Sequence, residues 1–158
     1  MGKRIKADEL CDEATRLLMS GEVDSAIELL NRSLAEEPTA EAFTYRGWAR
    51  SFKKEIEEAI EDCQRAIDTD PTFGNPYNDI GCYLIQLGRL DEAIPWLQKA
   101  KLAPRYEPRH FPYLNLGRIY VARGMLVEAL AEFRAALEIR PDDQSARVAV
   151  DTLRLSIN

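Results

Sequence analysis

Residues 88–105 read GRLDEAIPWLQKAKLAPR, and the same pattern recurs at residues 21–38, 54–71 and 124–141 of the 158-residue chain. In each block an alanine is followed four residues later by a larger apolar residue or a cysteine, and three residues after that by a small residue. In chain order the four sets are Ala26, Leu30 and Ser33; Ala59, Cys63 and Ala66; Ala93, Leu97 and Ala100; and Ala129, Phe133 and Ala136. Such spacing places the three side chains on one face of a helix. The blocks are therefore predicted to be helices that another helix can approach closely.

A second helical pattern precedes each block, and three of these patterns carry a glycine at the matching place, Gly47, Gly81 and Gly117. Glycine inside a helix is less favourable than alanine by roughly 1 kcal/mol. Its recurrence at one position indicates a steric need for close contact with the following helix. The first pattern carries the small residue Ala14 there.

The alanines that open the blocks are 33, 34 and 36 residues apart. A paired-helix unit close to ~34 residues resembles the tetratricopeptide repeat family. The resemblance implies an all-α fold, a right-handed α-solenoid of about four helix pairs that forms a single domain over residues 1–158. Asp142 or Asp143 is expected to cap one more helix, at about 144–156, which covers the last apolar face of the solenoid. The repeats are expected at about 7–39, 40–73, 74–109 and 110–143.

The charge of the chain limits its partners. The formal net charge is −6, whereas nucleic acid and anionic membranes require a concentrated basic surface, so neither is expected as a partner. Residues 1–73 hold 10 basic and 17 acidic side chains, and residues 74–158 hold 11 and 10. This imbalance indicates either a solvated acidic surface or a cationic partner for the N-terminal half.

Location is inferred from what the sequence lacks. No window approaches the ~18 consecutive apolar residues of a membrane span, and the start, MGKRIKADELCDEA, has no apolar run of a secretory signal. Cys11, Cys63 and Cys82 have a spacing that suits neither a disulfide framework nor a zinc site. We therefore expect a cytoplasmic protein without membrane insertion.

Catalytic and metal-binding motifs are also missing. His110 is the single histidine, so the sequence offers no zinc cluster, and no glycine-rich phosphate loop follows a predicted strand. Glu57, Glu58, Glu61 and Asp62 have a helical spacing that is typical of a solvated face rather than of an acid/base pair. We expect no catalytic activity, no metal and no cofactor, and a structural or merely exposed His110.

Candidate binding residues follow from the family resemblance, in which the first helix of each pair lines the concave side of the superhelix. The corresponding columns of this sequence hold Thr15, Tyr45, Trp48, Phe52, Asn78, Asp79, Cys82, Gln86, Asn115 and Arg118.

Three of these residues form an aromatic stripe, because Tyr45, Trp48 and Phe52 are three and four residues apart. Tyrosine and tryptophan are enriched among interface hot spots. The stripe either faces the groove and meets an apolar side chain of a peptide, or packs against the neighbouring first helix, and both interpretations stay open. If a peptide binds, Asn78 and Asn115 are expected to hydrogen-bond its backbone.

The resemblance implies a protein–protein interaction module, an adaptor that binds a peptide or a partner protein segment in its concave groove. A self-assembling scaffold is one alternative, in which the chain is a homo-oligomer. Some family members hold the carboxylate of chaperone tails with basic and asparagine side chains. Here Cys11, Thr15 and Asp79 occupy the matching columns, which argues against that role.

A narrower resemblance gives the other alternative, an assembly factor for an envelope machine. Residues 78–119 resemble the type IV pilus biogenesis branch of the family. The shared features are the opening Asn78 to Gly81, a two-residue expansion between repeats, and a Pro-Arg-Tyr turn before an Asn-Leu-Gly helix.

Residues 103–117, APRYEPRHFPYLNLG, contain Pro104, Pro108 and Pro112. A residue before proline avoids helical geometry, whereas proline is tolerated in the first turn of a helix. The segment is therefore predicted to be a joint between the third and fourth helix pairs. Its exposed side chains are expected to be Arg105, Tyr106 and Arg109.

Overall fold

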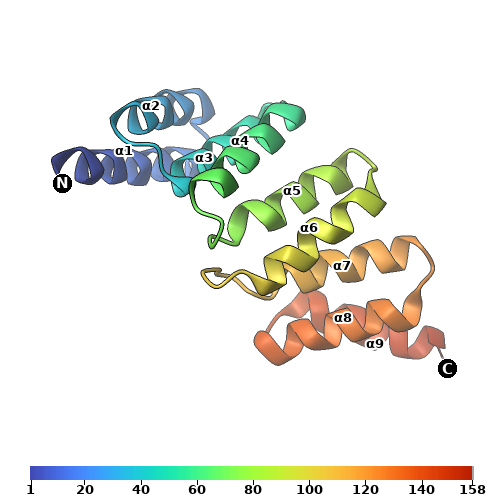
Figure 1. The fold of residues 1–158 in the computed structure, drawn as a ribbon. Coiled ribbons are helices and arrows are strands. Elements are labelled where there is room, and N and C mark those ends of the chain that lie inside the picture. The colour runs from blue at the N-terminus through green and yellow to red at the C-terminus, as the bar shows by residue number, and fades with distance from the viewer. Residues whose placement is uncertain (158) are drawn as a thin grey trace.

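The computed structural model describes residues 1–157 and contains nine α-helices and no strand in that range. The helices stack in chain order along an arc from the N-terminus to the C-terminus (Figure 1). Their bounds are α1 Gly2–Met19, α2 Val23–Glu36, α3 Ala40–Phe52, α4 Ile56–Thr69, α5 Asn75–Gln86, α6 Leu90–Leu102, α7 Phe111–Ala122, α8 Leu126–Ile139 and α9 Gln144–Ile157. The predicted all-α solenoid is confirmed, with α1 to α8 packed as four pairs and α9 packed against α8.

The helical glycines allow the two helices of a pair to touch. A Cβ atom at Gly81 would lie 2.4 Å from Cδ2 of Leu97, and one at Gly117 would lie 2.6 Å from Cζ of Phe133. At Gly47 the same atom would lie 2.9 Å from a backbone carbonyl oxygen of α4. All three distances are too short for a real carbon atom, so the predicted steric need is confirmed.

The turn between the helices of each pair contains one residue in the left-handed backbone region. Gly21, Gly88 and Gly124 have φ angles of 83°, 75° and 71°. In the second pair the position is occupied by Lys54, with a φ of 65°. A side chain in this conformation is unfavourable by roughly 1–2 kcal/mol. The turn between α3 and α4 therefore has the same backbone geometry as the other three turns, although this geometry is unfavourable for lysine.

Asp62 is fully buried between α3 and α4, so the expectation that it belongs to a solvated face is wrong. Its carboxylate accepts hydrogen bonds from Arg46 at 2.7 and 2.9 Å and from Arg65 at 2.9 Å. Arg50 Nη1 lies 2.9 Å from Oδ2 of the same group. Arg46 and Arg50 come from α3, and for this reason the spacing of carboxylates along α4 does not reveal the cluster.

The segment between α6 and α7 is tied to the loop that precedes α5. The N–H of Gly74 donates to the carbonyl oxygen of Arg105 at 2.9 Å, and the Arg105 N–H donates back to that loop at 3.1 Å. The Arg105 guanidinium bonds to Glu41 at 2.9 Å and to Asp70 at 2.7 Å. Tyr106 is 5% exposed, because its ring lies against Gly74. The predicted joint is observed, but the expected exposure of Tyr106 is wrong.

His110 and Asp143 connect the start of α7 to the start of α9. His110 is buried, and its Nε2 lies 3.4 Å from Oδ2 of Asp143. Oδ1 of Asp143 accepts a hydrogen bond from the N–H of Ala146 at 2.8 Å, which caps α9 as predicted. His110 thus has a structural place in the joint.

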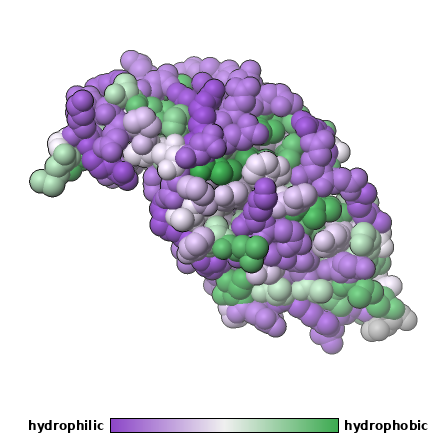
Figure 2. Space-filling view, in the orientation of Figure 1, coloured by the Kyte–Doolittle hydropathy of each residue, from purple (hydrophilic) through white to green (hydrophobic). Residues whose placement is uncertain are grey.

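Most of the face drawn in Figure 2 is hydrophilic, with apolar residues gathered toward the C-terminal end. On α9, Ala146, Val150 and Leu153 are buried against the preceding pair, whereas Val148 and Leu155 are 62% and 83% exposed. The last helix therefore covers the solenoid with one face and presents apolar side chains on another.

Candidate peptide-binding groove

Two adjoining cavities run along the first helices of the second, third and fourth pairs. The first cavity has a volume of about 700 Å³ and is lined mainly by α3 and α5. The second has a volume of about 280 Å³ and is lined by α5 and α7. Asp79 and Cys82 line both. We call this continuous surface the groove, and its lining residues are Trp48, Ser51, Phe52, Lys54, Ile56, Asn78, Asp79, Cys82, Tyr83, Gln86, Phe111, Leu114, Asn115 and Arg118.

Eight of the ten residues expected from the sequence line the groove, and Thr15 and Tyr45 do not. The hydroxyl of Thr15 donates to the carbonyl oxygen of Cys11 at 2.9 Å within α1. Tyr45 is partly buried against the core of the first pair, and this burial raises the pKa of its hydroxyl. Thr15 is therefore bonded within its own helix, and Tyr45 belongs to the packing around the first pair.

The aromatic stripe partly faces the groove and partly packs against the neighbouring helices. Trp48 and Phe52 line the first cavity, with ring centroids 5.2 Å apart. Phe52 is 50% exposed, whereas Trp48 also packs against the core of the first pair. The groove thus has an apolar wall whose outer ring is open to solvent.

A chain of polar side chains spans α5 and α7. Nδ2 of Asn115 donates to Oδ1 of Asn78 at 3.0 Å and lies 3.2 Å from the Cys82 sulfur. Nη1 of Arg118 donates to Oδ1 of Asn115 at 2.9 Å. Asn78 and Asn115 are 4% and 7% exposed. In the free protein, therefore, the two amides bond to each other and fix the guanidinium of Arg118, and a peptide backbone would have to displace these bonds to reach both.

Asp79 lies where the two cavities meet. Burial raises the pKa of its carboxyl to about 7, and the side chain of Asn78 offsets part of that shift. A carboxylate in such a place is poorly solvated and favours a positive group beside it.

The three cysteines are free thiols with little reactivity. Burial raises the pKa of Cys11 and of Cys82 to about 12, and it raises the pKa of Cys63 as well. Neighbouring carboxylates add to each shift. Because the thiolate is the reactive form, Cys82 contributes volume and a weak hydrogen-bond acceptor to the groove rather than a nucleophile.

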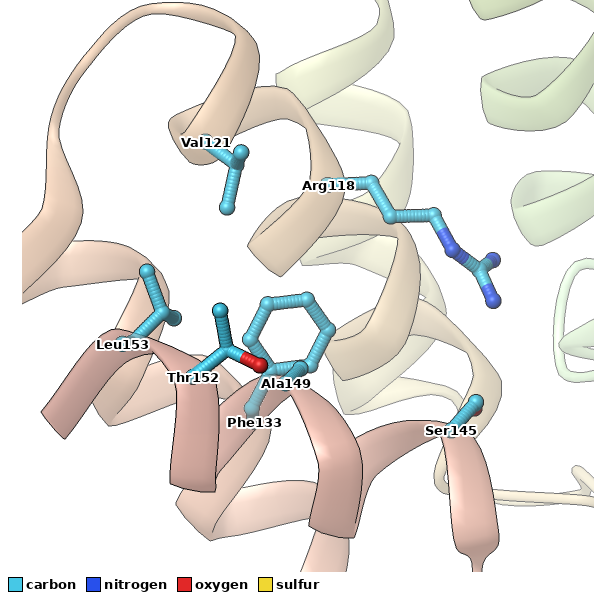
Figure 3. Close-up of a pocket in the computed structure, with 7 residues that line it drawn as sticks. All are labelled: Arg118, Val121, Phe133, Ser145, Ala149, Thr152 and Leu153. Carbon is cyan, nitrogen blue, oxygen red and sulfur yellow. The ribbon is translucent and has the colours of Figure 1, made fainter. Parts of the chain in front are cut away.

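A third cavity, of about 370 Å³, lies between α7 and α9 and includes the ring of Phe133 from α8. Figure 3 shows Val121, Ala149 and Leu153 around it, while Arg118 extends away from α9. This cavity could not be predicted from the repeat pattern, because its wall on α9 lies outside the four repeated pairs. Ser51, Lys54, Ile56 and Tyr83 also line the first cavity, and the sequence did not predict them because they lie outside the helical columns expected to face the groove.

Within residues 1–157, no group of three histidine, cysteine or acidic side chains is placed to hold a metal ion. Over the same residues, none of the helices has the length and apolar character needed to cross a membrane.

Solved structures similar to this chain have the same arrangement of helices. The solved structure of pilF from Pseudomonas aeruginosa has a TM-score of 0.93 at 21% identity. The match covers 99% of this chain and 71% of that one. PilW, described as a widely conserved type IV pilus biogenesis factor, has a TM-score of 0.81 at 21% identity, covering 89% and 64%. The first domain of Spaghetti bound to the HSP90 peptide SRMEEVD has a TM-score of 0.68 at 18% identity, covering 75% and 92%.

Sequence comparison points to the same family. Tetratricopeptide repeat protein 16 of Mus musculus is 26% identical over 94% of this chain, which spans about a fifth of that relative (21%). Sequence models described as tetratricopeptide repeat match residues 11–72, 75–104 and 110–143. The chain therefore belongs to the tetratricopeptide repeat family.

Proposed function

We propose that this chain is a non-catalytic adaptor that binds an extended or helical segment of a partner protein in the groove. The observation that carries the proposal is the continuity of the first two cavities along α3, α5 and α7 through Asp79 and Cys82. An apolar wall at one end and fixed polar groups at the other are the two features that a peptide site needs. The Spaghetti domain, which has the same fold, is bound to a peptide, and this supports peptide binding as the function.

The test compares two tryptophans that lie on different sides of the solenoid. Trp48 lines the groove, whereas Trp96 lies on α6 outside it, with Lys99 Nζ 4.6 Å from its ring centroid. For a partner segment selected on the wild type, Trp48→Ala is expected to weaken binding by more than about tenfold, as for an aromatic hot spot. Trp96→Ala is the matched control and should leave the affinity unchanged. Equal affinities of both folded variants would exclude the groove as the site.

A second candidate is a role in type IV pilus assembly. The resemblance of residues 78–119 to that branch and the fold shared with pilF and PilW favour it. The two candidates differ in compartment, because the adaptor proposal places the protein in the cytoplasm and a pilus factor acts in the envelope. Deletion of the gene from its native cell, followed by counting of surface pili, separates them. A normal number of pili would rule out the second candidate.

Self-assembly through the exposed apolar side chains of α9 is a third possibility. Light scattering over a concentration series tests it, and a constant monomer mass would exclude it.

A further inference from the structure

Asp79 carries a charge that the protein itself does not neutralise. Among residues 1–157, no lysine, arginine or histidine forms an ion pair with it, and Asn78 is the one side chain that favours its charged form. The fully buried Asp62 contrasts with it, since three arginines surround that carboxylate. A poorly solvated carboxylate without a counter-charge is unfavourable in its charged form, and either protonation or a neighbouring cation relieves this.

Tyr83, which lines the same cavity, has a buried hydroxyl. The hydroxyl of Tyr83 is buried without a hydrogen-bond partner in the described part of the chain, and Tyr83 is 4% exposed. The nearby hydroxyl of Ser51 donates to the carbonyl oxygen of Trp48 at 2.6 Å. Tyr83 and Ser51 both line the first cavity with Asp79. Buried polar groups are normally paired, so an unpaired hydroxyl beside the cavity is a group to which a ligand can hydrogen-bond.

Two cations line the groove with Asp79, Lys54 in the turn after α3 and Arg118 on α7, and neither forms an ion pair with it in the described part of the chain. The other titratable groups around Asp79 are Tyr45 on α3, Cys63 on α4, Cys82 and Tyr83 on α5, and Tyr106 in the joint. Arg118 donates instead to Asn115. Toward the N-terminus, Asp12 and Glu41 act with Asp79 to raise the pKa of Tyr45, so this side of the groove is negative.

The walls of the cavity suit an organic cation. Trp48 and Phe52 stand beside Asp79 in the first cavity, and aromatic faces attract ammonium and guanidinium groups. The volume of about 700 Å³ is sufficient for a long side chain and part of its backbone.

We propose that the groove takes a lysine or arginine side chain of the partner segment, with its charged end at Asp79 and Tyr83 and its stem along Trp48 and Phe52. The inference rests on the proposed function, since it names the chemistry of the segment that the groove binds. The cation donates hydrogen bonds to the carboxylate and to the Tyr83 oxygen. The HSP90 peptide SRMEEVD has three acidic residues and one arginine, so most of its charges are of the same sign as Asp79.

A random library of 12-residue displayed peptides tests the inference, with selection on the wild type, on Asp79→Asn and on Asp68→Asn. Asp68 is an exposed carboxylate on α4 and serves as the matched control. Selected sequences are expected to share one lysine or arginine position on the wild type and on Asp68→Asn, but not on Asp79→Asn. Replacement of that basic residue by glutamine in a synthetic peptide should weaken binding to the wild type about tenfold and leave binding to Asp79→Asn unchanged.

The possible outcomes separate the two claims. Selected peptides that are weakened by Trp48→Ala but share no basic residue would overturn the cation site and leave the groove intact. If replacement of the basic residue by glutamine weakens binding to Asp79→Asn tenfold, as it does for the wild type, the cation site is also overturned. If no peptide is enriched on the wild type at all, both the cation site and the proposed peptide binding fail. Melting curves of each variant confirm that it is folded.

Discussion

At the scale of single residues, burial of the Asp79 carboxyl makes the stability of the fold depend on pH, and this dependence can be measured. The pKa of its carboxyl is raised from its ordinary value of 3.8 to about 7 by burial. Between these pH values the folded protein keeps a proton that the unfolded chain releases. The free energy of unfolding therefore falls as pH rises through this window, by about 1.4 kcal/mol for each unit of pKa difference.

Asp79→Asn removes this dependence. The variant is expected to melt at a higher temperature than the wild type at pH 8, and to lose that advantage at pH 4. Thermal unfolding of both proteins at the two pH values is the measurement, with Asp68→Asn as control. A variant that is equally destabilised at both pH values would show that Asp79 is a structural residue.

Lys54 gives a second prediction at this scale. It adopts the left-handed backbone that glycine adopts in the other three turns. Lys54→Gly should raise the free energy of unfolding by about 1 kcal/mol, because the strain of the side chain is relieved. Gly88→Lys is the reverse change in a turn with open space around it and should lower stability by a similar amount. Urea unfolding of both variants checks the pair, and a loss of stability in Lys54→Gly would count against the strain.

At the scale of helix pairs, the close approach of α7 and α8 depends on Gly117. A methyl group there meets the ring of Phe133, and overpacking of this kind is unfavourable by about 1–3 kcal/mol. Alanine recovers about 1 kcal/mol through its helix preference. Gly117→Ala should therefore destabilise the protein modestly, and a smaller partner in Gly117→Ala/Phe133→Leu should restore part of the loss. Chemical unfolding of the single and double variants measures the coupling between the two positions. If the changes in the free energy of unfolding simply add, the contact between them is contradicted.

The helix pairs also show what the sequence can and cannot predict. The alanines, the glycines and the interval near 34 residues predicted the pairs and their contacts, because close helix packing restricts side-chain size at fixed positions. Asp62 was misjudged because its arginine partners come partly from another helix. Tyr106 was misjudged because the glycine that receives its ring lies far back in the chain.

At the scale of the whole molecule, the groove is a product of stacking, since neighbouring pairs contribute α3, α5 and α7 to one surface. Trp48, Phe52, Asn78 and Asn115 were predictable from their helical columns, whereas the other groove aromatics, Tyr83 and Phe111, were not. The mutual bonding of Asn78 and Asn115, the unsatisfied Tyr83 hydroxyl and the cavity beside α9 were not, because each depends on distances between helices that a repeat pattern does not fix.

Hydrogen–deuterium exchange of the protein with and without a selected peptide tests the central claim most directly. Binding in the groove predicts slower exchange of backbone amides in α3, α5 and α7, with α4, α6 and α8 little changed. Slower exchange confined to α4, α6 and α8 would contradict the account, since it would place the partner on the opposite face of the solenoid.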